Sequence, residues 1–209
     1  MRTATPALMP GMKVGLLGGS FNPAHEGHRH LSLMAMEKLQ LHRVWWLVSP
    51  QNPLKDKAGM ASLETRLASA RAAADHPRIC VSDIERRLGT AYTADTLKAL
   101  SARYPHVHFV WLMGADNMVQ FPKWRDWKTI ARTVPIAVYP RPGFTLKARL
   151  SKAAQYLARW RLEAADAALL PLVKAPALTF IEGPEHPASA TEIRAARARS
   201  GQPAWTTSR

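Results

Sequence analysis

The chain has 209 residues and a mass of 23.2 kDa, with 47% hydrophobic and 21% charged residues, which predicts one globular domain and excludes collagen-like, low-complexity and largely disordered proteins. Lysine and arginine number 29 against 15 acidic residues, and the formal net charge of +14 indicates an affinity for phosphates without distinguishing nucleic acids, membranes and small nucleotides. Cys80 is the single cysteine, which excludes an intrachain disulfide and a cysteine-based zinc site and favours a reducing cytoplasm.

Short apolar runs and amphipathic stretches alternate along the chain. The predicted strands are residues 12–17, 43–48, 78–81, 107–113, 134–139 and 178–181, and the predicted helices are 27–39, 62–74 and 93–103. This alternation predicts an α/β fold, a Rossmann-like doubly wound parallel sheet with helices on both faces. In such sheets, ligands bind at the carboxyl ends of the strands where the strand order reverses.

We expect a single domain over residues 1–209 with a C-terminal helical extension. Its core is predicted over 12–143 and 178–201, a basic helix or helical pair over 145–177 is predicted as an insertion, and the tails 1–11 and 202–209 are predicted to be flexible. No uncharged apolar run approaches the roughly 18 residues that a membrane helix needs. The residues before the first strand are too short and too rich in proline for a secretory signal.

The most informative string follows the first predicted strand and opens the first helix. It runs G-G-S-F-N-P-A-H-E-G-H from Gly18 to His28. Glycines allow backbone N–H groups to approach an anion, and the dipole of the following helix favours negative charge. His25 and His28 lie three residues apart in the first helical turn, where they can donate to phosphoryl oxygens. A metalloprotease pattern H-E-x-x-H would need histidine where Arg29 stands, so no metal site is predicted.

This string resembles the signature of the nucleotidyltransferase superfamily that includes the nicotinate-mononucleotide, pantetheine-phosphate and cytidylyl transferases. The resemblance implies that the two histidines bind the triphosphate of ATP and are the catalytic residues. It also implies a backbone cradle for the triphosphate, formed by Gly18, Gly19, Ser20 and Phe21.

A second string, S-A-T-E-I-R over residues 189–194, resembles the C-terminal motif of the same superfamily. By this resemblance, Ser189, Thr191 and Arg194 hold the β- and γ-phosphates at a helix start, where hydroxyls, N–H groups and a cation converge. Taken alone, the string would be interpreted as an ordinary helix cap. Its pairing with the glycine string favours the functional interpretation.

The middle of the chain resembles the bacterial nicotinate-mononucleotide adenylyltransferases, through G-A-D-N at 114–117 and F-P-K-W-R-D-W at 121–127. The resemblance implies that Asp116 contacts the ribose or adenylate of ATP. Trp124 would stack on the pyridine ring, although such a tryptophan is otherwise typical of helix packing. The residues implied for the mononucleotide are Asn52, Lys55, Tyr92, Thr93, Trp124 and Arg141.

The resemblance implies transfer of the adenylyl group of ATP to nicotinate mononucleotide, giving nicotinate adenine dinucleotide and pyrophosphate in NAD biosynthesis. Mg²⁺ is expected with ATP, and the acid mononucleotide is expected to be preferred over the amide. The expected partners are these small molecules, without nucleic acid or membrane, for a monomer or homo-oligomer in the cytoplasm. One alternative is another adenylyltransferase such as the pantetheine-phosphate enzyme. A second is a basic RNA-binding module using residues 147–161, although no RRM, KH or double-stranded RNA motif is present.

Overall fold

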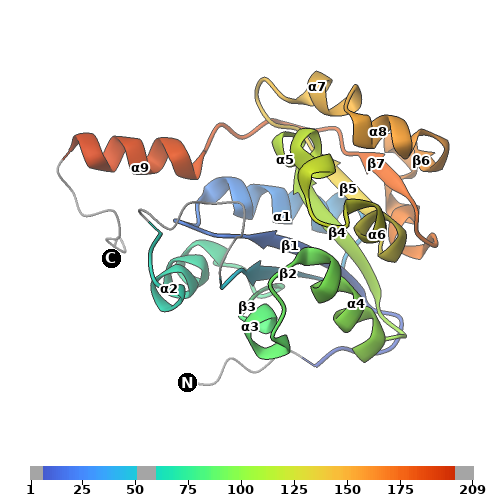
Figure 1. Cartoon of the computed structure of the whole chain (residues 1–209), viewed down its shortest axis with the longest axis horizontal. Helices are drawn as coiled ribbons and strands as arrows, with labels where there is room; N and C mark the ends of the chain where they lie inside the picture. Colours follow the sequence, from blue (N-terminus) through green and yellow to red (C-terminus); the bar gives the residue numbers. More distant parts are fainter. Residues whose placement is uncertain (1–6, 51–59, 201–209) are drawn as a thin grey trace.

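A computed structural model of the chain, which describes residues 7–50 and 60–200, has one parallel sheet of seven strands at its centre (Figure 1). The strand order is β3-β2-β1-β4-β5-β7-β6, so the predicted doubly wound α/β fold is confirmed. Each of the six predicted strands is present within two residues at either end. The strands are β1 (Lys13–Gly19), β2 (Arg43–Val48), β3 (Ile79–Ser82), β4 (His108–Gly114), β5 (Ile136–Tyr139), β6 (Arg161–Leu162) and β7 (Leu178–Phe180).

The helices cover both faces of this sheet (Figure 1). Three of them, α1, α2 and α4, confirm the predicted helices, and α2 begins where the Ser62 hydroxyl accepts a hydrogen bond from the backbone N–H of Thr65. The α-helices are α1 (Glu26–Lys38), α2 (Leu63–Ala74), α3 (Ile84–Leu88), α4 (Thr93–Arg103), α5 (Ala115–Gln120), α6 (Trp127–Thr133), α7 (Thr145–Arg149), α8 (Lys152–Tyr156) and α9 (Ala190–Arg199). Short 3-10 turns are η1 (Phe121–Lys123), η2 (Ala158–Trp160) and η3 (Ala164–Leu172).

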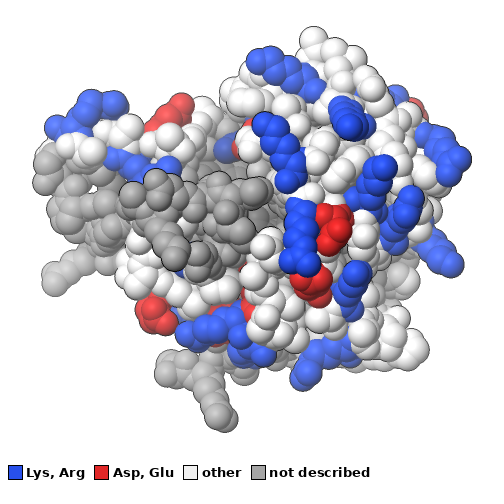
Figure 2. Space-filling model, in the orientation of Figure 1, with Lys and Arg blue, Asp and Glu red and all other residues white. Residues whose placement is uncertain are grey.

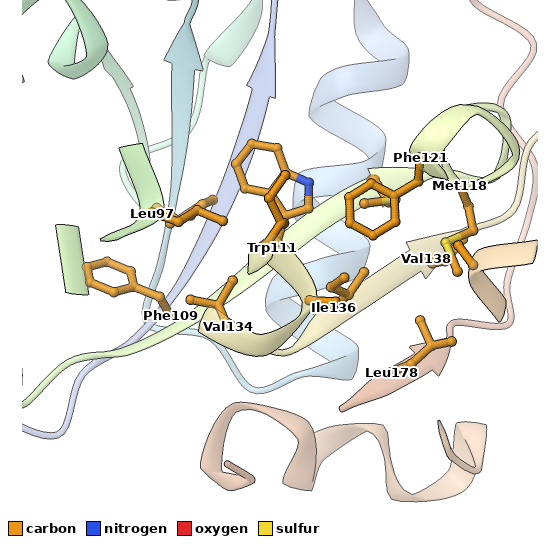
Figure 3. Packing of buried hydrophobic residues seen from close by; sticks show 14 of the residues in the cluster. Leu97, Phe109, Trp111, Met118, Phe121, Val134, Ile136, Val138 and Leu178 are labelled. Carbon is orange, nitrogen blue, oxygen red and sulfur yellow. The ribbon is translucent and has the colours of Figure 1, made fainter. Parts of the chain in front are cut away.

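Side chains alternate between two apolar cores along each strand, because successive residues of a strand point to opposite faces. On β4, Phe109 and Trp111 pack into the core beneath α4, α5 and α6, whereas Val110 and Leu112 pack into the core beneath α1 and α2. Figure 3 shows the first core, in which Trp111, Phe121 and Ile136 lie close together. Helices and apolar side chains therefore cover both faces of the sheet. A ligand can reach the sheet only where the strands end.

The segment 145–177 differs from the prediction of a purely helical insertion. α7 and α8 form the helical pair, but Arg161 and Leu162 then form β6, which pairs with β7 at the edge of the sheet. Thr179 Oγ1 donates a hydrogen bond to the carbonyl of Leu162 at 3.2 Å, and Ala148 is fully buried in the first core. The expectation of helix throughout is wrong because the sheet edge offers backbone partners that local sequence does not reveal.

The strand order reverses between β1 and β4. Chain connections run outward in both directions from this pair, so their carboxyl ends border the crevice in which doubly wound sheets bind ligands. β1 leads into the glycine string and β4 leads into α5, which carries Asp116. The glycine string and the G-A-D-N string, two of the three strings predicted to contact ATP, thus begin at the reversal point.

On the face that Figure 2 shows, basic residues are spread out instead of forming one patch. Figure 2 shows lysine and arginine side chains distributed across the visible face, with acidic side chains beside some of them. Among the helices built from residues 7–50 and 60–200, none combines the length and the apolar character that crossing a bilayer requires.

Candidate active site

β1 ends in Gly18 and Gly19, and the chain then turns over Ser20 to Pro23 before α1; we call residues 18–23 the glycine turn. Gly18, still within β1, must be glycine because the strand passes close to Trp111. A Cβ atom on Gly18 would lie 3.0 Å from Cζ2 of the Trp111 ring and closer still to the neighbouring ring carbon, so no side chain fits there. Phe21, three residues on, has φ +46°, a left-handed conformation uncommon outside glycine. The buried ring of Phe21 stacks on Trp46 at a centroid distance of 5.2 Å. Packing thus holds the turn in a strained shape.

The two histidines of the string cap the first helix reciprocally. The backbone N–H of Gly27 donates to Nδ1 of His25, and the backbone N–H of His25 donates to Nδ1 of His28, each at 3.2 Å. Because Nδ1 is the acceptor in both rings, a neutral ring carries its proton on Nε2. Folding therefore selects the tautomer in which Nε2 is the donor.

Burial keeps His25 neutral. Its side chain is 9% exposed, and burial, followed by the charges of Arg141 and His186, lowers its pKa to about 4. The rings of His25 and His28 lie 3.9 Å apart between centroids, so the two N–H donors belong to one small surface. At neutral pH this surface offers hydrogen bonds from the uncharged His25 ring, not an acid.

The C-terminal string lies against this turn. Arg194 Nη1 donates to the carbonyl of Asn22 at 2.6 Å, joining residues 172 positions apart, and Arg194 Nη2 donates to Thr191 Oγ1 at 3.2 Å. A Cβ atom on Gly27 would lie 3.3 Å from the carbonyl oxygen of Ala188, the residue before Ser189. α9 itself extends away from the body (Figure 1). The structure thus brings Ser189, Thr191 and Arg194 to the start of α1.

Asp116 and Arg141 connect the ends of β4 and β5. Nε of Arg141 lies 3.6 Å from Oδ1 of Asp116, and Nη1 of Arg141 donates to the carbonyl of Ala188 at 3.1 Å. Oδ1 of Asp116 is buried and has no hydrogen-bond partner among the described residues. Arg141 therefore anchors the irregular segment that precedes the C-terminal string, and Asp116 offers an acceptor nearby.

The remaining predicted residues lie around the start of α4. Tyr92 is the N-cap and Thr93 is the first residue of this helix, and the Arg125 guanidinium stacks over the Tyr92 ring at 4.2 Å. Trp124 is half-buried, with its edge contacts to Trp111 and Phe121 fixing its plane. Because Trp111 contacts Trp124 and also lies beside Gly18, Trp124 lies next to the glycine turn, one tryptophan away. Asn52 and Lys55 lie outside the described residues.

Two buried polar residues near these strings were not predicted. Arg66 of α2 is 2% exposed and Glu85 of α3 is 6% exposed. A signal existed for Arg66, because it lies on the apolar stripe of α2 with Leu67 and Ala70, where a cation is unexpected. Glu85 has no such signal, since α3 is only five residues long.

Glu85 lies under the start of α4. Burial raises the pKa of Glu85 to about 7 from 4.5, against the smaller, lowering influence of hydrogen bonding with the side chains of Ser49 and Thr96. Thr96 also donates to the carbonyl of Tyr92 at 3.2 Å. Glu85 therefore links the end of β2 to the first turn of α4.

We expect Glu85→Gln to remove a pH dependence of stability. Because the folded state binds this proton more tightly than the unfolded chain, the contribution of Glu85 falls as the pH rises from about 4.5 to about 7 and is constant above. The full difference is about 3 kcal/mol. Urea unfolding of wild type and variant at pH 5 and pH 8 measures most of this difference: between the two pH values, the stability of the variant relative to the wild type should rise by about 2.5 kcal/mol. A difference independent of pH would contradict the shifted pKa.

Comparisons with known proteins point to one family. A family model described as cytidylyltransferase-like matches residues 16–196. A protein of Parvibaculum lavamentivorans named "Probable nicotinate-nucleotide adenylyltransferase" is 68% identical over 90% of this chain and 93% of its own length. A Roseobacter denitrificans protein of the same name is 50% identical over 93% of this chain and 97% of its own length. In fold, the chain is similar to the Plasmodium falciparum nicotinic acid mononucleotide adenylyltransferase complexed with NaAD, with a TM-score of 0.67 at 16% identity over 88% of this chain and 83% of that one.

Proposed function

The chain belongs to the nicotinate-nucleotide adenylyltransferase family of cytidylyltransferase-like proteins, and we propose that it transfers the adenylyl group of ATP to nicotinate mononucleotide. The observation that carries this proposal is the convergence of the capped histidine pair, the glycine turn and Arg194 on one point, where 2.6 Å separates Arg194 Nη1 from the Asn22 carbonyl. Donors and a cation gathered at a helix start suit a polyphosphate.

In the proposed reaction, a phosphate oxygen of the mononucleotide forms a bond to the α-phosphorus of ATP in line with the bond to the bridging oxygen, which breaks. Pyrophosphate leaves with the electron pair of that bond. Nε2–H of His25 and of His28 would stabilise charge on the α-phosphoryl group, and Ser189, Thr191 and Arg194 would stabilise the leaving pyrophosphate. Catalysis is then positioning and charge stabilisation, without a nucleophilic side chain.

Magnesium fits this scheme as part of the ATP complex. Within residues 7–50 and 60–200, no group of three or more His, Cys, Asp or Glu side chains could hold a metal ion, and Asp116 is paired with Arg141. Phosphate oxygens and water would therefore be the main ligands of Mg²⁺. The ion would offset phosphate charge. We place the reaction in the cytoplasm, because Cys80 is the single cysteine.

The function is tested by incubating the purified chain with ATP, Mg²⁺ and one acceptor at a time. Nicotinate mononucleotide, nicotinamide mononucleotide and phosphopantetheine are the acceptors, pyrophosphate release is the readout, and mass spectrometry identifies the product. We expect release with nicotinate mononucleotide and formation of nicotinate adenine dinucleotide. Release with phosphopantetheine alone would move the assignment to that transferase. Salt-sensitive RNA retention without any turnover would favour an RNA-binding module.

We predict that the acid mononucleotide is preferred over the amide. The start of α4 and the Arg125 guanidinium over Tyr92 both favour a carboxylate, whereas stacking on Trp124 serves both rings equally. Trp124→Ala should therefore lower kcat/KM for acid and amide alike, by about 2- to 10-fold. Thr93→Val should narrow the preference, and Thr93→Ser, which retains the hydroxyl, is the matched control. Equal use of acid and amide by the wild type would contradict the carboxylate assignment.

A further inference from the structure

Arg66 joins three segments of backbone from inside the protein. Its Nη1 donates to the carbonyls of Ser20 at 2.8 Å and Ser49 at 2.6 Å, its Nη2 to Pro50 at 3.0 Å, and its Nε to Ala61 at 3.0 Å. Ser20 follows β1, and Ser49 follows β2. One planar guanidinium thus ties together the ends of two neighbouring parallel strands, at the edge where the candidate site lies.

The hydrogen bond to Ser20 also sets the direction of the next N–H group. In a trans peptide the C=O and N–H bonds point in opposite directions. Since the carbonyl of Ser20 points at Arg66, the N–H of Phe21 points away from it. Phe21 has the strained φ of +46°, and such a conformation persists only where its surroundings hold it. Arg66 is therefore a support for the shape of the glycine turn.

The same side chain reaches the start of α4 through Ser49. The carbonyl of Ser49 accepts from Arg66, and the hydroxyl of Ser49 hydrogen-bonds Glu85, whose carboxyl group also binds Thr96. Thr96 lies in the first turn of α4, one turn after Thr93. Arg66, Ser49 and Glu85 therefore connect the glycine turn, proposed for ATP, with the helix start proposed for the mononucleotide.

The charge of Arg66 is held without a carboxylate partner among the described residues. Its four hydrogen bonds go to neutral carbonyls, and no described acidic group lies within ion-pair distance of it. Burial lowers the pKa of Arg66, while the charge of Glu64, whose own ion pair is with Arg86 on the surface, raises it. A buried positive charge is costly unless a negative charge approaches, and substrate phosphates at the turn would provide one.

We propose that Arg66 is a positioning residue for adenylyl transfer, which aligns the glycine turn with the start of α4 and adds a buried positive charge behind the phosphates. This inference rests on the proposed function and goes beyond it, because Arg66 belongs to none of the strings that carry the family resemblance. It acts through Ser20, Ser49 and Glu85, not by contact with the reacting atoms.

Two substitutions separate the geometry of Arg66 from its charge. R66K keeps the charge and loses the planar fork, whereas R66Q loses the charge and keeps a planar amide donor. Arg71→Lys and Arg71→Gln are the matched controls, since Arg71 is exposed on the same helix. Urea unfolding first establishes a temperature at which each variant is folded. Calorimetry with ATP alone then gives its Kd, and steady-state assays with nicotinate mononucleotide give kcat and both KM values.

R66K should lower kcat by about 10- to 100-fold, because small misplacements of reacting groups have effects of this size. Its Kd for ATP should stay within about threefold of wild type, while R66Q should weaken ATP binding by roughly tenfold more. If R66Q fails to fold, R66K decides. A folded R66K with wild-type kcat, or losses that follow only the folded fraction, would overturn the proposal. An inactive wild type would instead refute the proposed function, so the two failures are distinguishable.

Discussion

His25→Asn is expected to lower kcat by about 10² to 10³ while leaving the protein folded. Removal of one preorganised donor to a charged transition state typically has this effect. Asparagine is chosen because its side-chain oxygen can still accept the hydrogen bond from the backbone N–H of Gly27 and so preserves the helix cap, but it lacks Nε2–H. This variant therefore separates the role of His25 in capping the helix from its role in catalysis.

His28→Ala and His25→Ala complete this series. Each should lose activity as His25→Asn does, and each should also lose about 1 kcal/mol of stability, since one partner of the reciprocal cap is gone. His106→Ala is the control, because His106 is exposed and precedes β4. It therefore lies at the amino ends of the strands, away from the candidate site at their carboxyl ends. Steady-state assays and urea unfolding on the same preparations measure both effects. If both alanine variants kept more than half of wild-type turnover, the assignment to the triphosphate would be wrong.

Arg194→Ala is expected to weaken ATP binding and turnover together by about 10- to 100-fold, since hydrogen bonds to charged groups are worth about 1.5–3 kcal/mol. The physical basis is its place beside the glycine turn, where Nη1 contacts the Asn22 carbonyl and Nη2 contacts Thr191. Loss of these two contacts should lower the melting temperature by only a few degrees for a chain of this size.

Arg199→Ala is the matched control for Arg194, because Arg199 is exposed near the end of the same helix. Calorimetry with ATP and thermal unfolding are compared for the two variants. A matched loss of stability in Arg194→Ala with unchanged ATP affinity would return the C-terminal string to the role of a simple helix cap. The comparison thus tests whether the string serves the ligand or the fold.

The sheet could be predicted because its strands are apolar runs buried on both faces, as Arg43–Val48 illustrates. β6 could not, since Arg161 and Leu162 form only two residues of edge strand, and their pairing with β7 depends on tertiary contacts. α5 was missed because it begins directly after β4, with Gly114 as its N-cap and no side-chain cap. Short elements are decided by their neighbours more than by their own sequence.

Within the candidate site, linear strings predicted the histidines and Arg194 but not the contacts between strings. The pairing of Asp116 with Arg141 follows from the register of β4 and β5, in which Gly114 lies opposite Tyr139. Sequence gives the residues on each strand but not this register. Arg66 donates its hydrogen bonds to backbone carbonyls. Every residue type has such a carbonyl, so the sequence does not show which residues accept these bonds. Its role could therefore be found only in three dimensions.

The reciprocal cap of α1 requires the two histidines to be three residues apart. One ring must lie at the N-cap and the other three residues later. Only then can Nδ1 of His25 accept from the backbone N–H of Gly27 while Nδ1 of His28 accepts from the backbone N–H of His25. An insertion or deletion between them would unwind the helix start and scatter the donors in the same event. An engineer seeking to change the anion bound here should therefore leave this string intact and vary nearby residues such as Arg194 of α9 and Arg141, which follows β5.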